Sequence, residues 1–189
     1  ARTCQILSDV LGTTFSQASL QSALQEGSQQ VGPALDLIKA ALIKAPVLHN
    51  DETGVRVARK LWWLHVAATR QLTWYQAHRS RGAIATDAIG ILPDFKGVSV
   101  HDSLLSYLQY DCLHALCNAH YLRELIYMEE HHQQAWATAL KDLLLQIKAR
   151  VELAVSQGLP QLPPQVCADY EARYEQMVMP ALAAHPPPE

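Results

Sequence analysis

Two aspartates in this chain, Asp51 and Asp102, each follow a short apolar segment. Carboxylate oxygens are hard ligands that suit Mg²⁺ or Mn²⁺. Two such ions about 4 Å apart can activate an attacking hydroxyl and stabilise the leaving oxygen in phosphodiester chemistry. A buried carboxylate is costly unless it is paired or metal-bound, so Asp51 must lie at an exposed strand end or have a partner. The simpler alternative is that both aspartates are ordinary strand-end or turn residues.

A mixed sheet would position these aspartates. Three segments rich in Val, Trp, Leu, Thr and Tyr predict an antiparallel meander, with strands over residues 47–57, 60–69 and 72–79. The pattern then predicts a helix over 82–92 ended by Pro93, a strand over 97–102, a short helix over 104–110 and a strand over 112–116. A meander followed by strand–helix crossovers predicts an α/β fold with a mixed five-stranded sheet and flanking helices.

Period-two alternation gives the aspartates a common position. It places Val47, His49 and Asp51 on one face of the first strand, and Val100 and Asp102 on one face of the fourth. If these two strands are neighbours, both carboxylates meet at one edge of the sheet, each at the end of its strand.

Helical segments flank the predicted sheet. Ser16 can cap a helix in the N-terminal region, and the chain is again helical from residue 121, with a clear amphipathic stretch over 135–157. The pattern divides the chain into an N-terminal helical segment, a sheet core, a helical insertion and a linker, at residues 1–44, 45–120, 121–183 and 184–189.

Bulk composition describes an ordinary soluble globular protein. Of 189 residues, 49% are hydrophobic and 17% are charged, and we see no apolar stretch long enough to span a bilayer. Four widely spaced cysteines and no secretory signal favour reduced thiols in a cytoplasm. The start lacks Met, which suggests an excised piece of a longer protein. A net charge of -3 gives no general attraction to nucleic acid, so DNA contact would need a local basic patch or basic segments outside this chain.

Several motifs between residues 45 and 130 carry a family resemblance: Asp-Glu-Thr after an apolar strand, Lys-Leu-Trp-Trp, Ser-Arg-Gly, and Cys-x-x-His after the fifth strand. The region that contains them, with the stretch "NDETGVRVARKLWWLHVAAT" near its start, resembles the central domain of the insertion-sequence 66 transposases. The resemblance implies a ribonuclease-H-like fold with an Asp-Asp-Glu metal site, in which Asp51 is the first catalytic aspartate and Asp102 the second.

The same resemblance implies a function and partners. The parent protein would be a bacterial transposase that cleaves DNA at transposon ends and joins the strand to target DNA, with Mg²⁺ or Mn²⁺ as cofactor. Its partners would be transposon-end and target DNA, accessory proteins of the same element, and further copies of itself in the active complex. A ribonuclease-H-like nuclease or resolvase, and a non-catalytic remnant that binds DNA or oligomerises, are the alternatives.

The third carboxylate of such a site is difficult to place. The family has it in an Asn-Asn-x-x-Glu-Arg-like motif after the helical insertion, whereas this chain contains only two asparagines, which are not adjacent. We therefore expect the third carboxylate beyond residue 189. Glu124, Glu129 and Glu130 are the acids close after the fifth strand, and their setting favours the solvated face of an amphipathic helix over a metal ligand.

Other candidate residues have two interpretations each. Cys117 and His120 could form half of a zinc site, but a structural zinc site needs four ligands, which favours packing without zinc. The remaining histidines, including His131 and His132, are interpreted as surface residues. Trp62, Trp63 and Trp74 are core residues or a base-stacking platform. A basic excess on the meander could contact phosphates or simply be solvated; its members are Arg56, Arg59, Lys60, Arg79 and Arg81.

Overall fold

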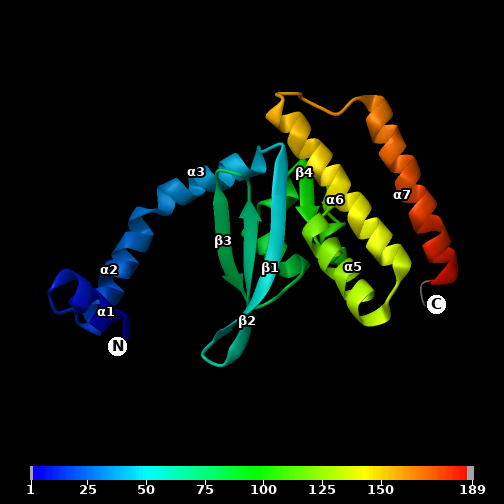
Figure 1. The fold of residues 1–189 in the computed structure, drawn as a ribbon. Coiled ribbons are helices and arrows are strands. Elements are labelled where there is room, and N and C mark those ends of the chain that lie inside the picture. Colours follow the sequence, from blue (N-terminus) through cyan, green and yellow to red (C-terminus); the bar gives the residue numbers. More distant parts are fainter. Residues whose placement is uncertain (1, 187–189) are drawn as a thin grey trace. The chain divides into compact units, whose positions relative to one another are not determined.

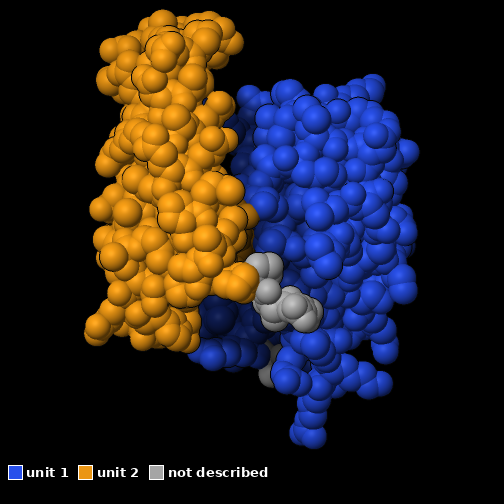
Figure 2. All heavy atoms as spheres, turned by 90° about the vertical axis from the view of Figure 1, so that its right-hand side faces the viewer, with its two compact units in different colours: residues 1–116 blue, residues 117–189 orange. Residues whose placement is uncertain are grey.

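The computed structural model describes residues 2–186 of the chain. These residues form two compact units, one ending at Leu116 and the other beginning at Cys117 (Figure 2). The first unit contains the sheet and the second contains only helices, so we describe each by itself.

The N-terminal region of the first unit is helical, as the sequence predicts. Its helices are α1 (Arg2–Leu11), α2 (Gln17–Gln30) and α3 (Gly32–Ile43). Ser16 caps α2, because its hydroxyl accepts a hydrogen bond of 2.9 Å from the backbone N–H of Ser19. Pro33 lies in the first turn of α3, where its missing N–H costs nothing.

A five-stranded sheet forms the centre of the first unit (Figure 1). Its strands are β1 (Val47–Val57), β2 (Lys60–Ala68), β3 (Thr73–His78), β4 (Val98–His101) and β5 (Leu113–Leu116). The strand order is β3-β2-β1-β4-β5. Strands β1 to β3 pair antiparallel, β4 pairs parallel to β1, and β5 pairs parallel to β4. This is the ribonuclease-H-like arrangement of a meander extended by two crossover strands, and it confirms the predicted fold class.

Short helical elements connect β3, β4 and β5: α4 (Ala83–Ile89), η1 (Leu92–Asp94) and η2 (Leu105–Tyr107), the last two being 3₁₀ turns. The prediction that Pro93 ends the first of these helices is wrong. Gly90 ends α4, because it adopts a left-handed conformation with φ of 66° and donates its N–H to the Thr86 carbonyl. Pro93 instead lies inside η1. The predicted helix over 104–110 is shortened to the single turn of η2.

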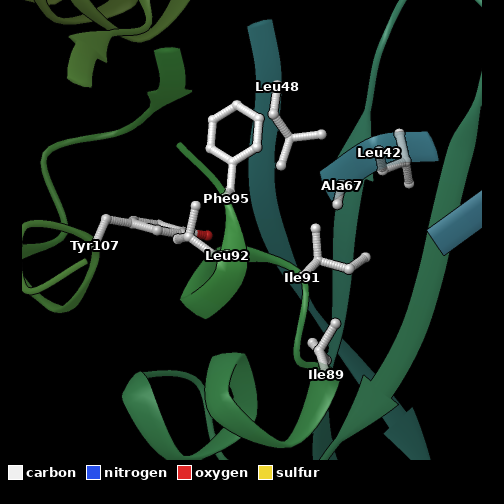
Figure 3. Packing of buried hydrophobic residues seen from close by; sticks show 8 residues of the cluster. All are labelled: Leu42, Leu48, Ala67, Ile89, Ile91, Leu92, Phe95 and Tyr107. Atoms are coloured by element: carbon white, nitrogen blue, oxygen red, sulfur yellow. The ribbon is translucent and has the colours of Figure 1, made fainter. Parts of the chain in front are cut away.

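The hydrophobic core lies on one face of the sheet, where α3, α4 and η1 cover it (Figure 3). Leu48 of β1 and Ala67 of β2 are buried there, together with Leu42, Ile91 and Phe95 from the covering segments. Along β1 the buried residues alternate with exposed ones, as a period of two requires. This face therefore receives every second residue of β1 counted from Leu48.

The second unit consists of α5 (Asn118–His132), α6 (Ala135–Ser156) and α7 (Pro164–Ala184). Helix α5 packs against α6, and α6 packs against α7. α5 begins three residues before the predicted position, directly after Cys117. Within the described residues, every helix is too short or too polar to cross a membrane.

Candidate functional site

Asp51 lies inside a strand and not at its end, which corrects the sequence-based expectation. β1 runs on to Val57, and Asp51 pairs with Val66 of β2. The residue is exposed, and its Oδ1 accepts a hydrogen bond of 2.8 Å from the backbone N–H of Glu52. Since Val47 and His49 are also exposed, alternation places Asp51 on the sheet face opposite Leu48. Its charge is thus solvated, and no burial cost arises.

Asp102 follows β4, the parallel neighbour of β1, which confirms the expectation that the two aspartates lie on neighbouring strands. The paired residues run from Val47 with Val98 to His49 with Val100. If this register continued for two more residues, Asp51 would lie opposite Asp102. Asp102 Oδ1 accepts a hydrogen bond of 2.9 Å from the Leu104 N–H, and the side chain keeps 20% of its surface exposed.

Glu52 is the buried acid of this region, with only 1% of its side chain exposed. It lies on the core face with Leu48, and both of its oxygens have donors. Arg81 Nε donates to Oε1 at 2.8 Å, and the Tyr107 hydroxyl donates to Oε2 at 2.5 Å. A buried carboxylate needs such partners, because an unpaired charge there is strongly destabilising. The adjacent carboxylates of β1 therefore have opposite environments: Asp51 is solvated and Glu52 is paired.

Sequence reasoning missed the role of Glu52, although a signal for it was present. Leu48 is the large apolar residue of this part of β1, and alternation from Leu48 through Asn50 reaches Glu52. Asn50 likewise finds a partner on this face, since its side-chain amide donates to the Ser99 hydroxyl of β4 at 2.9 Å. The alternation could thus have identified Glu52 as buried, but not its partners, which lie 29 and 55 residues away.

Tyr107 anchors Glu52 from the turn η2. Its ring is buried and stacks on that of His101, with 4.7 Å between the ring centroids. Burial raises the pKa of Tyr107 above its ordinary value, and the hydrogen bond to Glu52 raises this pKa further, because both favour the neutral phenol. Tyr107 thus remains a hydrogen-bond donor throughout the neutral range.

We expect Tyr107→Phe to lower the free energy of unfolding by about 2 kcal/mol, because it deletes a buried hydrogen bond to a charged group. Urea denaturation measures the effect. A raised folded-state pKa stabilises the fold below the unfolded tyrosine value of about 10, and this stabilisation is lost as the pH rises above it. The variant should therefore lose less stability than the wild type between neutral and strongly alkaline pH.

Tyr110→Phe is the matched control for this prediction. The hydroxyl of Tyr110 donates a hydrogen bond of 2.8 Å to the exposed Asp87. Burial raises the pKa of Tyr110 to about 12, and this hydrogen bond is the second cause of the shift. Loss of a bond to an exposed carboxylate should cost below about 1 kcal/mol. Equal destabilisation by both variants would contradict a special role of Tyr107.

One buried histidine, His101, holds the segment around Asp102, although the sequence suggested that the histidines lie on the surface. His101 is fully buried, and His65 is 5% exposed. His101 Nδ1 contacts the Asp102 carbonyl, and its Nε2 lies 3.0 Å from His114 Nδ1 of β5. His114 Nε2 is in turn 3.1 Å from the Tyr110 carbonyl. These contacts connect β4, β5 and the segment that follows η2.

The structure separates the basic residues of the meander into two groups. Arg56, Arg59 and Lys60 are exposed around the β1–β2 turn. Arg79 and Arg81 lie after β3, with their guanidinium carbons 4.8 Å and 4.9 Å from the ring centroids of Trp62 and Trp63. Arg81 also contacts Asp102 Oδ2 at 3.6 Å. The half-buried Trp62 and Trp63 thus stack with arginines, while Trp74 packs against the core.

The other candidates lie on α5 in the second unit. Glu124 and Glu130 are exposed on this helix, and Glu129 pairs with Lys141 of α6. This pairing lowers the pKa of Glu129. Cys117 precedes the first turn of α5, and His120 lies in that turn, where its buried Nδ1 has no hydrogen-bond partner among the described residues. That Cys117 and His120 pack without zinc stays a prediction, as does the interpretation of the glutamates as a solvated helix face.

The donor set near the sheet suits a hard divalent cation. Asp51 and Asp102 offer carboxylate oxygens, and both side chains are accessible to solvent. Among residues 2–186, no group of three or more His, Cys, Asp or Glu side chains is arranged to hold a metal ion. The two aspartates thus fit Mg²⁺ or Mn²⁺ by their chemistry, and they would be two of the three carboxylates that the resemblance implies.

The strand order β3-β2-β1-β4-β5, with aspartates on β1 and directly after β4, defines a ribonuclease-H-like domain. Within that class, the chain belongs to the Transposase IS66 family, which it matches over residues 1–187. The family is the one that the motifs indicated, and its members are enzymes of DNA transposition.

Two similar solved structures are a viral integrase domain and a viral intasome. One is the catalytic core domain of the HTLV-2 integrase in complex with magnesium (dimeric form), with 13% identity, a TM-score of 0.32 and coverage of 46% of this chain and 74% of that chain. Another is the simian T-cell lymphotropic virus intasome in complex with PP2A regulatory subunit B56 gamma, with 13% identity and a TM-score of 0.30. The matched part covers 47% of this chain and 42% of that chain. A comparison with curated proteins gives no match.

Proposed function

We propose that this chain is the catalytic core of a bacterial DNA transposase, which cleaves a DNA strand at transposon ends and joins its 3′-hydroxyl to target DNA. Membership of the Transposase IS66 family supports the class of reaction. The observation that carries the site is the position of Asp51 on β1 and of Asp102 directly after its parallel neighbour β4. The protein would act in the cytoplasm, where its four free cysteines remain reduced.

In this proposal the chain's own residues bind the cation and hold its ligands in position. Asp51 and Asp102 would hold Mg²⁺ or Mn²⁺, which when bound would supply charge for activating the attacking hydroxyl and stabilising the leaving oxygen. The contacts of Asp102 with the Leu104 N–H and of its carbonyl with His101 fix the position of this aspartate. Such positioning matters because phosphoryl transfer depends mainly on placement and charge. The active form would be a homo-oligomer on transposon-end and target DNA, assisted by accessory proteins of the same element.

A third carboxylate would complete the site from sequence beyond residue 189. Glu124 and Glu130 are exposed on α5, and neither belongs to a metal-binding cluster among the described residues. A site with two of its three carboxylates should bind a second ion poorly. We therefore expect the 189-residue chain to fold without nicking or joining DNA.

A strand-transfer and nicking assay in Mn²⁺ tests this proposal. It compares the 189-residue chain with a chain extended past Glu189, on DNA that carries the transposon end. Cleavage and joining by the extended chain alone is the expected result. Cleavage without joining would instead identify a nuclease or resolvase. Activity of the 189-residue chain that is lost on Glu124→Gln or Glu130→Gln would place the third ligand on α5.

The tip of the β1–β2 hairpin is our candidate for DNA contact. Pairing of β1 with β2 extends to Val57 and Lys60, whereas β3 pairs with β2 only from Trp63 onward, so the tip projects beyond β3 (Figure 1). Among the described residues, Arg56, Arg59 and Lys60 form no ion pair. A projecting two-stranded ribbon fits a DNA groove, and its free cations can neutralise phosphates.

Replacing Arg56, Arg59 and Lys60 together by Gln should weaken duplex binding and reduce its salt dependence. Each lost phosphate contact lowers the slope of log affinity against log salt by about 0.9, so a loss of roughly 2 to 3 is expected. Fluorescence anisotropy across a salt series measures the slope. The control replaces the exposed Lys44, Arg123 and Lys148 by Gln, with the same change of charge. An equal fall in both triple variants would show that the hairpin has no special role.

A further inference from the structure

One guanidinium lies between two carboxylates in the first unit. Arg81 Nε is 2.8 Å from Glu52 Oε1, and Arg81 Nη2 is 3.6 Å from Asp102 Oδ2. The first is a short, directional hydrogen bond, while the second is too long for one. Arg81 is thus bound by the buried Glu52 and only approached by the solvent-accessible Asp102.

Several contacts hold Arg81 at Glu52. Tyr107 donates to the second oxygen of Glu52, which fixes the rotamer of this carboxylate, and Trp63 lies beneath the guanidinium. The backbone before Arg81 is also tied down, because the Ser80 N–H donates to His78 Nδ1 at 2.9 Å and the Ser80 carbonyl lies 3.1 Å from His65 Nε2. Arg81 is therefore not free to turn wholly toward Asp102.

Which carboxylate pairs with Arg81, Glu52 or Asp102, matters for cation binding at Asp102. A guanidinium paired with Asp102 would occupy an oxygen that a divalent cation needs, and it would repel that cation. Because Glu52 takes the short hydrogen bond, Asp102 Oδ2 has only the long contact with Arg81. Glu52 also compensates the positive charge of Arg81 beside Asp102.

We propose that Glu52 is a positioning residue for the metal site: it holds Arg81 by the Nε hydrogen bond and so keeps Asp102 available to a divalent cation. This inference rests on the proposed function, since it assigns the cation to Asp51 and Asp102. It extends that function by two residues that are not metal ligands, the buried Glu52 and the partly exposed Arg81. Neither residue would touch the DNA strand or the reacting atoms.

Mn²⁺ affinity, measured by electron paramagnetic resonance on the folded 189-residue chain, tests the inference without any DNA substrate. Glu52→Gln is nearly isosteric and removes only the charge that restrains Arg81. It should weaken Mn²⁺ binding about tenfold, because the guanidinium then has Asp102 as its anionic partner. Glu52→Gln combined with Arg81→Met should restore the wild-type affinity or exceed it. A purely structural role of Glu52 predicts no such recovery.

Two further variants keep the test decisive if Glu52→Gln fails to fold. Arg81→Met alone should bind Mn²⁺ at least as tightly as the wild type, whereas weaker binding would overturn the inference. Tyr110→Phe removes a hydroxyl that bonds Asp87 and not Glu52, Arg81 or Asp102, so it should leave Mn²⁺ affinity unchanged. Wild-type binding that is lost on Asp102→Asn but unaffected by Glu52→Gln would overturn the role of Glu52 and leave the metal site intact. If the wild type shows no Mn²⁺ binding that depends on Asp102, both the role of Glu52 and the proposed metal site are overturned.

Discussion

Asp102→Asn in a chain extended past Glu189 is expected to reduce DNA strand transfer by about a thousandfold. A metal ion that polarises a phosphoryl oxygen contributes several kcal/mol to the reaction, and each 1.36 kcal/mol corresponds to roughly a tenfold change in rate. Asparagine keeps the acceptor for the Leu104 N–H but loses the charge that holds the ion. Asp51→Asn should have an effect of similar size. Single-turnover strand transfer in Mg²⁺ and in Mn²⁺ measures both.

Asp94→Asn provides the matched control, because this exposed aspartate lies in η1 and its replacement removes the same charge. Its rate should stay within about twofold of the wild type, since surface substitutions away from a site have small effects. A second readout uses mass action: Mn²⁺ should raise the melting temperature of the wild type but not that of Asp102→Asn. Strand transfer that survives in both aspartate variants would exclude these residues as the metal ligands.

Gly97→Ala is expected to destabilise the first unit by about 3 kcal/mol, which is large for the addition of one methyl group. A Cβ at this position would lie 2.5 Å from the Pro46 carbonyl oxygen, 2.8 Å from the Ala45 carbonyl oxygen and 2.7 Å from Phe95 Cζ. Two of these atoms belong to the backbone that leads into β1. The fully buried Phe95 has no room to yield, so the entry to β4 would have to shift.

Gly27→Ala is the matched control for Gly97→Ala. A Cβ at Gly27 meets nothing within 4 Å, and the residue lies inside α2. Alanine is favoured over glycine in a helix by roughly 0.5–1 kcal/mol, so this variant should be slightly stabilised. Urea denaturation of both variants measures the difference. A cost below about 1 kcal/mol for Gly97→Ala would show that β1 and β4 adapt more easily than their packing indicates.

The sheet could be predicted from the sequence because its signals are local. Alternating apolar residues and two-residue gaps such as Ala58-Arg59 define the meander, and both gap residues adopt the left-handed conformation of a tight hairpin turn. The ends of the elements were less predictable. Pro93 is a strong breaker, but Gly90 ends α4 first, since glycine adopts the left-handed conformation without strain.

The candidate site was only partly predictable for a different reason. Alternation and the family motifs identify Asp51 and Asp102 from local sequence, one within β1 and the other directly after β4. The pairing of Glu52 with Arg81 and Tyr107 depends instead on how the turns after β3 and β4 fold back onto the sheet. The burial of His101 likewise depends on its packing against Tyr107 and His114. Such contacts are set by tertiary structure, which a local pattern does not contain.

The projecting β1–β2 hairpin also has a consequence for solubility. β4 pairs with β1 at Val47–His49 and β3 pairs with β2 from Trp63 onward, so the tip offers two open strand edges. Val57 and Leu61 are about half exposed there, with 49% and 52% of their surface accessible. Open apolar edges invite pairing with another copy of the chain, and charged residues oppose this aggregation. The arginines and the lysine at the tip would thus act as gatekeepers that keep the free protein from aggregating.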